Sequence, residues 1–263
     1  MNGVVEAFLL GLIEGLTEFL PVSSTGHLLI AQHWLGQRSD LFNIVIQAGA
    51  IVAVSLVYRR RLWALATGLH QAETRAYAGK LALAFAVTAA LGIPVRLAGW
   101  ELPETVTPIA WALILGGVWI LVAEWLSGRR PERGDVTWTI AILVGVAQVV
   151  AGVFPGLSRS AAAIFIAMLA GLNRRPAAAE FAFLLGIPTM FAASGYAFVE
   201  YLAEGSGGED WVQLGVAFVT ATVTGFLAVR WLLGYIKSHR FTAFAVYRIA
   251  LGLALLLGLP ASA

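Results

Sequence analysis

Residues 14–28 read EGLTEFLPVSSTGHL and place two carboxylates, four hydroxyls and an imidazole between apolar segments. An ionisable side chain at membrane depth costs about 2.5 to 3.5 kcal/mol to insert, so such side chains usually serve a function. Glu14 and Glu18 are four residues apart and share a face of a helix that we expect to end near Pro21. Two like charges at this spacing repel unless a divalent cation bridges them or one carboxylate holds a proton.

The residues after the proline have the features of a phosphate site. Ser23, Ser24 and Thr25 lie where the next helix would begin, and Gly26 allows a close approach of the backbone. Free N–H groups and hydroxyls at a helix N-terminus suit phosphate. His27 follows directly, and an imidazole can act as a nucleophile or as a general acid.

A second polar segment, PGLSRS at residues 155–160, is of the same type as PVSST at residues 21–25. Ser158 and Ser160 again lie at an expected helix start, and the forked guanidinium of Arg159 suits phosphate oxygens. The two segments therefore predict one phosphate site that is made from both halves of the chain.

The composition predicts the kind of protein that carries this site. The chain has 263 residues, of which 59% are hydrophobic and 12% charged, against about 25% charged residues in soluble domains. There is no cysteine, which excludes disulfides and a cysteine nucleophile. Dispersed basic residues also argue against a nucleic-acid partner. Six apolar runs are long enough to span a bilayer, near residues 42–58, 80–96, 107–126, 181–203, 212–236 and 241–260.

Two further regions, 4–35 and 136–172, are interrupted by Pro, Gly, Ser and charge, which predicts two re-entrant helical hairpins. We therefore expect an all-α integral membrane protein that forms a single domain over residues 1–263. It would contain six transmembrane helices and two hairpins in an inverted-topology repeat of residues 1–126 and 136–263. Inverted repeats with broken helices are typical of secondary transporters, so a transporter is the main alternative to an enzyme.

The distribution of basic residues predicts the orientation by the positive-inside rule. Four expected loops hold most of the Lys and Arg residues and should face the cytoplasm, whereas the acidic segments 101–104 and 204–210 should lie outside. The basic residues of these loops are Arg59, Arg60, Arg61, Arg75 and Lys80, then Arg129, Arg130 and Arg133, then Arg174 and Arg175, and finally Lys237 and Arg240.

Residues 14–28 resemble the glutamate-rich motif of the bacterial undecaprenyl-diphosphate phosphatases of the BacA type, and weaker similarity extends over nearly the whole chain. The second motif of that family is matched in part, with Ala161 in place of a glycine and Ala163 in place of a threonine. Asn43 also stands where the family more often has an acid. The matching residues of the second motif are Pro155, Gly156, Ser158, Arg159 and Ser160.

The resemblance implies a phosphatase of the bacterial inner membrane that depends on a divalent cation, Mg²⁺ or Ca²⁺. It would remove the terminal phosphate of undecaprenyl diphosphate on the periplasmic side, which recycles the lipid carrier for cell-wall synthesis and is linked to bacitracin resistance. Glu14 and Glu18 would bind the metal or act as base, and Arg159 would hold the diphosphate. The substrate would also contact Ser23, Ser24, Thr25, Gly26, Ser158 and Ser160.

Three questions stay open at the level of sequence. The nucleophile is His27, which we favour, or Ser24 with Glu18 or His27 as base. Arg248 lies within an apolar run and needs a partner, for which Glu180 and the substrate phosphate are candidates. The scaffold could instead move the lipid as a flippase, or persist as an inactive paralogue, and a homodimer is compatible with the sequence.

Overall fold

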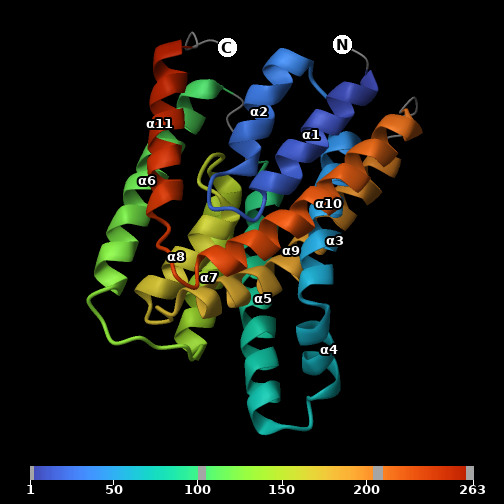
Figure 1. Ribbon diagram of the computed structural model, residues 1–263. Coiled ribbons are helices and arrows are strands. Elements are labelled where there is room, and N and C mark those ends of the chain that lie inside the picture. Colours follow the sequence, from blue (N-terminus) through green and yellow to red (C-terminus); the bar gives the residue numbers. More distant parts are fainter. Residues whose placement is uncertain (1–2, 100–104, 204–209, 259–263) are drawn as a thin grey trace.

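The computed structural model describes residues 3–99, 105–203 and 210–258, and these ranges fold into eleven α-helices (Figure 1). The chain is therefore an all-α protein over the described residues, as predicted. The helices are α1 Gly3–Thr17, α2 Ser24–Leu35, α3 Asp40–Val57, α4 Arg59–Thr67, α5 Ala72–Leu97, α6 Val106–Ser127, α7 Trp138–Val153, α8 Arg159–Leu169, α9 Arg175–Ala203, α10 Trp211–Tyr235 and α11 Thr242–Gly258.

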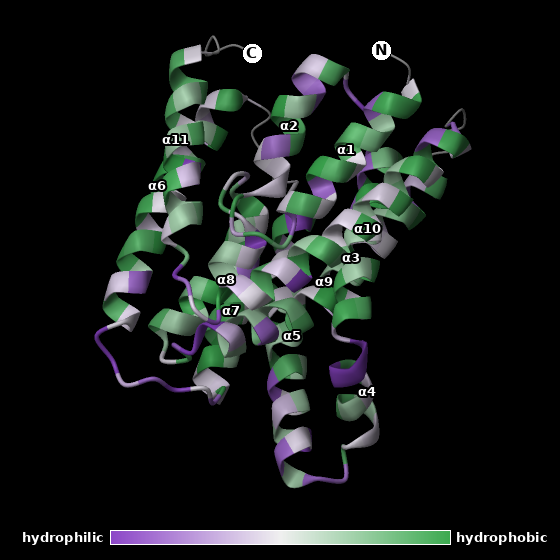
Figure 2. Ribbon diagram, viewed as in Figure 1, coloured by the Kyte–Doolittle hydropathy of each residue, from purple (hydrophilic) through white to green (hydrophobic). Residues whose placement is uncertain are grey.

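Five of these helices are long and apolar enough to cross a bilayer, namely α3, α5, α6, α9 and α10. The helices consist mostly of hydrophobic residues, while hydrophilic residues are concentrated at the α4–α5 and α6–α7 connections (Figure 2). The chain is therefore a multi-pass membrane protein. The sixth expected span corresponds to α11, whose 17 described residues fall just short of the length of the other five.

Both interrupted regions form pairs of helices, as the sequence predicted. Residues 18–23 separate α1 from α2, and residues 154–158 separate α7 from α8. The expected end of the first helix near Pro21 was wrong, because α1 ends at Thr17. A proline ring clashes with the carbonyl of the residue four positions earlier, which for Pro21 is Thr17, so the regular helix ends there. Glu18 nevertheless keeps a helical bond, since its N–H donates to the carbonyl of Glu14 at 2.9 Å.

The five basic residues of the first expected loop lie in helices. Arg59–Arg61 form the first turn of α4, and Arg75 and Lys80 lie within α5 and not in a loop. Long basic side chains can keep their charge in water while their stems lie along an apolar helix, so helices can extend past the apolar run. The acidic segments 101–104 and 204–209 lie outside the described residues.

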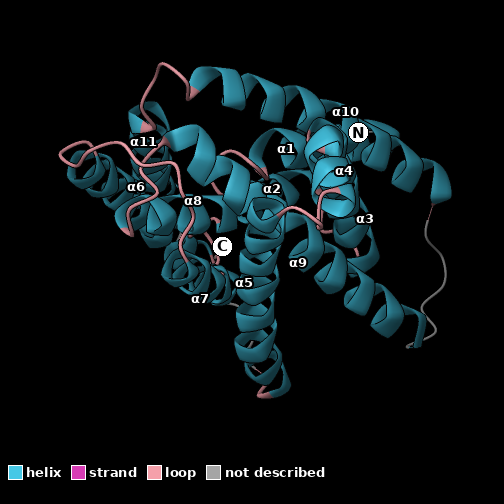
Figure 3. Ribbon diagram, turned by 90° about the horizontal axis from the view of Figure 1, so that it is seen from below, coloured by secondary structure: helices cyan, strands magenta, loops and turns pink. Residues whose placement is uncertain are grey.

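Each half of the chain packs its broken helix against a long helix of the other half. Helix α1 packs on α10, and α7 packs on α5. Viewed from below, α1 and α10 lie along one side of the molecule and α5 and α7 along the other (Figure 3). Helices in corresponding places also meet directly, since α3 packs on α9 and α6 on α11.

Small residues allow these helices to approach closely. A Cβ atom at Gly145 of α7 would lie 2.6 Å from the carbonyl oxygen of Ala84 in α5. At Gly15 of α1, a Cβ atom would lie 2.5 Å from the carbonyl oxygen of Ala221 in α10. Membrane helices associate through this kind of small-residue contact because lipid provides no hydrophobic driving force between them.

Polar interactions fix two helix ends outside the apolar layer. Buried Glu124 of α6 accepts bonds from Arg175 Nε at 2.8 Å and Nη2 at 2.6 Å, and from the N–H of Phe241 at 3.0 Å. Asp210 caps α10, and hydrogen bonds from the Gln213 side chain and from backbone N–H groups lower the pKa of its carboxyl. The first network joins α6, α9 and the residue before α11 at the basic end of the molecule.

Candidate active site

The two polar tips have the same unusual backbone. Ser23 has φ 73° and Ser158 has φ 72°, and they are the only non-glycine residues with positive φ among those described. Each serine caps the following helix, because Ser23 Oγ accepts from the Gly26 N–H and Ser158 Oγ from the Ala161 N–H, both at 3.3 Å. Strained backbone of this kind is concentrated at functional sites.

Glu18 joins the two tips. Its Oε1 accepts a hydrogen bond from Arg159 Nη2 of the second tip at 3.1 Å, and its Oε2 accepts a short hydrogen bond from Ser24 Oγ of the first tip. The Glu18 side chain is only 5% exposed, so the carboxylate is held in a nearly dry environment. A hydroxyl bonded to a buried carboxylate, beside an arginine, is an arrangement suited to attack on a phosphate.

Serine side chains tie the second tip to the first. Ser160 Oγ donates to the carbonyl of Leu20 at 3.1 Å, and Ser158 and Ser160 share a hydrogen bond at 2.9 Å. Both tips lie near the middle of the molecule, where their connecting loops face each other (Figure 1). The structure thus brings both halves of the predicted phosphate site together.

Arg248 of α11 donates hydrogen bonds to the backbone of both tips. A guanidinium has five N–H donors, and all five of Arg248 donate to backbone carbonyls at 2.8 to 3.4 Å. The side chain is fully buried. The accepting carbonyls belong to Pro21 of the first tip, Gly156 and Leu157 of the second tip, and Ala112 and Leu113 of α6.

The sequence suggested Glu180 as an ionic partner of Arg248, and this was wrong. Glu180 Oε1 is bonded to Arg61 Nε at 2.9 Å instead. An arginine can satisfy its charge with a ring of carbonyl dipoles, which a search for acidic partners does not consider. With every N–H of Arg248 already donated, the geometry makes it a residue that positions the tips.

A cavity of about 360 Å³ opens beside the two polar tips. Its wall combines the carboxylate of Glu18, the hydroxyl of Ser24 and the guanidinium of Arg159 with groups from α3 and α9. A volume in this range suits a small ligand or the head of a larger one. Its other polar lining residues are Ser23, Thr25, Gln47, Arg96, Ser158 and Ser194.

His27 lies apart from the cavity wall. Its Nδ1 bonds to the carbonyl of Ser23 at 2.6 Å, its Nε2 bonds to Tyr247 Oη at 2.6 Å, and its ring stacks on that of Tyr247. Both ring nitrogens are therefore engaged within the protein. Of the two candidate nucleophiles, Ser24 is the one that lines the cavity and has a carboxylate partner.

Glu14 lies one helical turn below Glu18 and is 1% exposed. Its Oε2 is buried without a hydrogen-bond partner in the described part of the structure. A buried carboxylate oxygen that lacks a partner has the chemistry of a ligand for a hard cation. The described residues contain no cluster of three or more His, Cys, Asp or Glu, so a cation here would have two carboxylates and would need further oxygen ligands.

The two residues that depart from the second motif, Ala161 and Ala163, are buried in the core. Ala161 and Ala163 are each 1% exposed and lie in the core on α8. The Ala161 N–H still bonds to the capping Ser158. Asn43 lies in α3, where its side-chain oxygen accepts a bond from Gln32 at 2.9 Å. The second tip thus has the same serine-capped conformation as the first, with alanines in place of the glycine and the threonine.

Arg96 is a residue near the site that the sequence did not single out, whereas Gln148 stood out only for its spacing, since it lies one residue further from Pro155 than the family pattern implies. Arg96 lines the cavity from the end of α5, where it forms an ion pair with Glu200 and stacks at 4.3 Å on the ring of Tyr196. Gln148 of α7 adjoins Glu18 and Arg159 in a narrow crevice. A lone arginine at the end of an apolar run was the available signal for Arg96, but it is also typical of a membrane-interface anchor.

Fold and site together define a multi-pass helical membrane protein with a buried site of carboxylate, hydroxyl and guanidinium groups. The model of the bacitracin resistance protein BacA family matches residues 7–254. The chain belongs to this family.

Individual relatives are similar to the chain over the full length. A protein of Stenotrophomonas maltophilia (strain K279a) is 71% identical over 261 residues, which is 99% of each chain. A protein of Xanthomonas campestris pv. campestris (strain 8004) is 65% identical over 263 residues, which is all of each chain. Both are named undecaprenyl-diphosphatase.

Proposed function

We infer that the chain is an undecaprenyl-diphosphate phosphatase, which converts undecaprenyl diphosphate into undecaprenyl phosphate and inorganic phosphate. Full-length relatives at 65% to 71% identity carry that name. The observation that carries the inference is the bond from Ser24 Oγ to the buried carboxylate of Glu18, which also contacts Arg159. A lipid flippase needs charge complementarity but no activated hydroxyl.

In the proposed reaction, Ser24 Oγ attacks the terminal phosphorus while Glu18 Oε2 takes the hydroxyl proton. The bond between that phosphorus and the bridging oxygen breaks, and undecaprenyl phosphate leaves with the bridging oxygen and the proton from Glu18. Arg159 stabilises the charge on the transferring phosphoryl oxygens. Water then attacks the phosphoserine, gives a proton to Glu18, and releases phosphate as Ser24 regains its proton.

We propose that Glu14 and Glu18 would hold a divalent cation, Mg²⁺ or Ca²⁺, which would need further oxygen ligands besides these two carboxylates. Such an ion, when bound, neutralises phosphate charge and polarises the phosphoryl group. The unpartnered Oε2 of Glu14 supports this assignment.

Excess chelator should lower phosphate release by about 10³-fold, because a bound cation contributes several kcal/mol to the transition state. Added Mg²⁺ or Ca²⁺ should restore the rate. Glu14→Gln should show a smaller response to both additions, since its carboxylate is one of the two proposed ligands. Full activity in excess chelator, with no metal found in the purified protein, would contradict the cation site.

Arg96 is the second cation on the cavity wall, and we propose that it binds the phosphate nearer the prenyl chain. Arg96→Gln should raise KM about tenfold and leave kcat within about twofold, since a bond to a charged group contributes about 1.4 kcal/mol or more. Glu200→Gln is the matched control, because it frees Arg96 from its ion pair. Its KM should stay the same or fall, and an equal rise in both variants would argue against a phosphate contact.

We propose that the chain is one membrane domain with six spanning helices and two re-entrant hairpins, related as an inverted repeat. Reciprocal packing of α1 on α10 and of α7 on α5 supports the repeat, as do the matching capping serines. The basic connections would face the cytoplasm of the inner membrane and the site cavity would open to the periplasm. The reaction would then recycle the lipid carrier at the outer face.

Product analysis separates the phosphatase from the flippase. The purified protein should release one inorganic phosphate for each undecaprenyl phosphate formed. Transfer of intact undecaprenyl diphosphate across a vesicle membrane without phosphate release would identify the flippase instead.

A further inference from the structure

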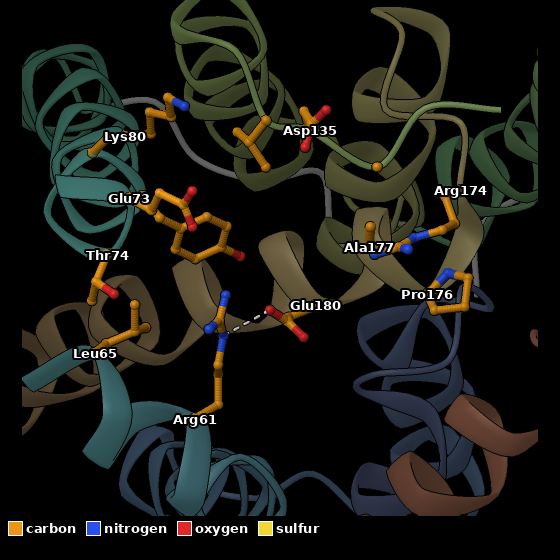
Figure 4. A pocket seen from close by; sticks show the side chains of 14 residues that line it. Arg61, Leu65, Glu73, Thr74, Lys80, Asp135, Arg174, Pro176, Ala177 and Glu180 are labelled. Carbon is orange, nitrogen blue, oxygen red and sulfur yellow. Dashed lines mark hydrogen bonds and ion pairs between the residues drawn. The ribbon is translucent and has the colours of Figure 1, made fainter. Parts of the chain in front are cut away.

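A second cavity, of about 630 Å³, lies at the basic end of the molecule (Figure 4). It is bounded by α4, α5, the start of α9 and the segment between α6 and α7. It shares no lining residue with the cavity beside the polar tips. We call it the basic-end cavity, and its volume is in the range of binding sites for small molecules.

Six charged side chains line the basic-end cavity, and their formal charges sum to zero. Arg61, Lys80 and Arg174 are cationic, and Glu73, Asp135 and Glu180 are anionic. Arg61 and Glu180 form an ion pair at 2.9 Å. The other four form no ion pair within the part of the chain that the structure describes, so two cations and two carboxylates are left to face a ligand.

These charges come from different elements, and two of the cations lie against aromatic rings. The guanidinium of Arg61 lies 4.8 Å from the centre of the Tyr77 ring, and Lys80 Nζ lies 5.8 Å from that of Trp138. In Figure 4 the side chain of Arg174 extends towards the cavity from the side opposite Glu73. Apart from the pair of Arg61 and Glu180, the charged groups are spaced around an open volume and form no ion pairs with one another.

The charge pattern selects among ligands. A purely anionic head group would meet three carboxylates, and a purely cationic ligand would meet three cations. A ligand with one phosphate and one ammonium group satisfies both sets. Quaternary ammonium groups are recognised by aromatic cages. Among the residues that line the basic-end cavity, the one aromatic side chain is Tyr77, and its ring is already covered by Arg61. A primary ammonium, which can donate hydrogen bonds to carboxylates, fits better.

The surroundings indicate that the ligand is a lipid. Helix α5 is apolar, and only 6% of its most hydrophobic window is buried within the protein, so its surface is available to acyl chains. On the other flank, Trp63 of α4 is 72% exposed. Tryptophan is enriched at the level of lipid head groups, so the mouth of the cavity lies at that level.

We propose that the basic-end cavity binds the head group of a zwitterionic phospholipid that carries a phosphate and a primary ammonium group, with the acyl chains along α5. Arg174 and Lys80 bind the phosphate, and Asp135 and Glu73 accept bonds from the ammonium. This site is distinct from the proposed phosphatase site and does not depend on that reaction.

Native mass spectrometry of the full-length protein, loaded with phospholipids of identical acyl chains, tests the proposal. Phosphatidylethanolamine should be retained at least about tenfold better than phosphatidylcholine or phosphatidylglycerol. Arg174→Gln and Asp135→Asn should each remove that preference. The matched controls are Arg129→Gln and Glu132→Gln, which alter neighbouring charges outside the cavity wall and should keep it.

Phosphate release from undecaprenyl diphosphate should stay within about twofold in all four variants, which shows that each is folded. Equal retention of the three lipids by the unaltered protein would overturn the proposal, as would an unchanged preference in both cavity variants. Displacement of the lipid by soluble phosphoethanolamine at equal concentration would overturn the assignment to a lipid and identify a free phosphate ester as the ligand.

Discussion

Replacing Ser24 by Ala is expected to lower kcat for phosphate release by at least about 10⁴-fold, which is the scale of loss when a nucleophile is removed. Ser24 Oγ donates to Glu18 Oε2 and lines the site cavity, so the substitution removes the attacking atom and leaves the carboxylate in place. Retention of undecaprenyl diphosphate should persist, because Arg159 still holds the phosphate. Stopped assays of released phosphate, together with lipid retention, measure both effects.

His27→Ala is the control for this prediction. His27 bonds to the carbonyl of Ser23 and to Tyr247, so its loss should lower the rate by about tenfold or less through a looser first tip. A phosphoenzyme that survives in Ser24→Ala but is absent from His27→Ala would assign the attack to His27. That outcome would restore the choice favoured from sequence.

Replacing Arg248 by Lys is expected to have the largest effect on the free energy of unfolding. The five bonds from Arg248 join carbonyls of both tips to α6, and an ammonium has three donors in a different geometry. The free energy of unfolding should fall by about 3 kcal/mol or more, because buried carbonyls lose charged partners. In the fraction that stays folded, kcat/KM should fall by about 10²-fold, since a small displacement of a catalytic group is enough.

Gly116→Ala tests the same contact without altering the charge. A Cβ atom at Gly116 would lie 2.8 Å from Cζ of Arg248 and would displace the guanidinium. This variant should lower kcat with little change in KM, because it moves the two tips relative to each other but leaves Arg159 intact. If Gly116→Ala loses stability but keeps kcat, then Arg248 is a packing residue only.

The polar tips were predictable because local chemistry determines them. Prolines interrupt both helices, and serines followed by a new apolar run mark the next helix start. The pairing of the two tips was predicted from their similarity. The bond between Arg159 and Glu18 joins residues far apart in sequence, and it matches the single phosphate site that was expected.

The remaining features depend on packing that local patterns do not contain. Arg248 is satisfied by five backbone carbonyls, which have no side-chain signature. Arg96 reaches the site only because α5 continues to Leu97 and packs near α9. The separation of His27 from the cavity depends on Tyr247, which comes from the last helix and stacks on it.

The central claim is that Glu18, positioned between the two tips, drives hydrolysis of undecaprenyl diphosphate. Phosphate release by the purified protein, measured beside Glu18→Gln with lipid retention determined on the same samples, tests it most directly. We predict release by the unaltered protein and a rate at least about 10³-fold lower in Glu18→Gln, with similar retention of the lipid. An unchanged rate in Glu18→Gln, or retention of the lipid by the unaltered protein without any phosphate release, would contradict the claim.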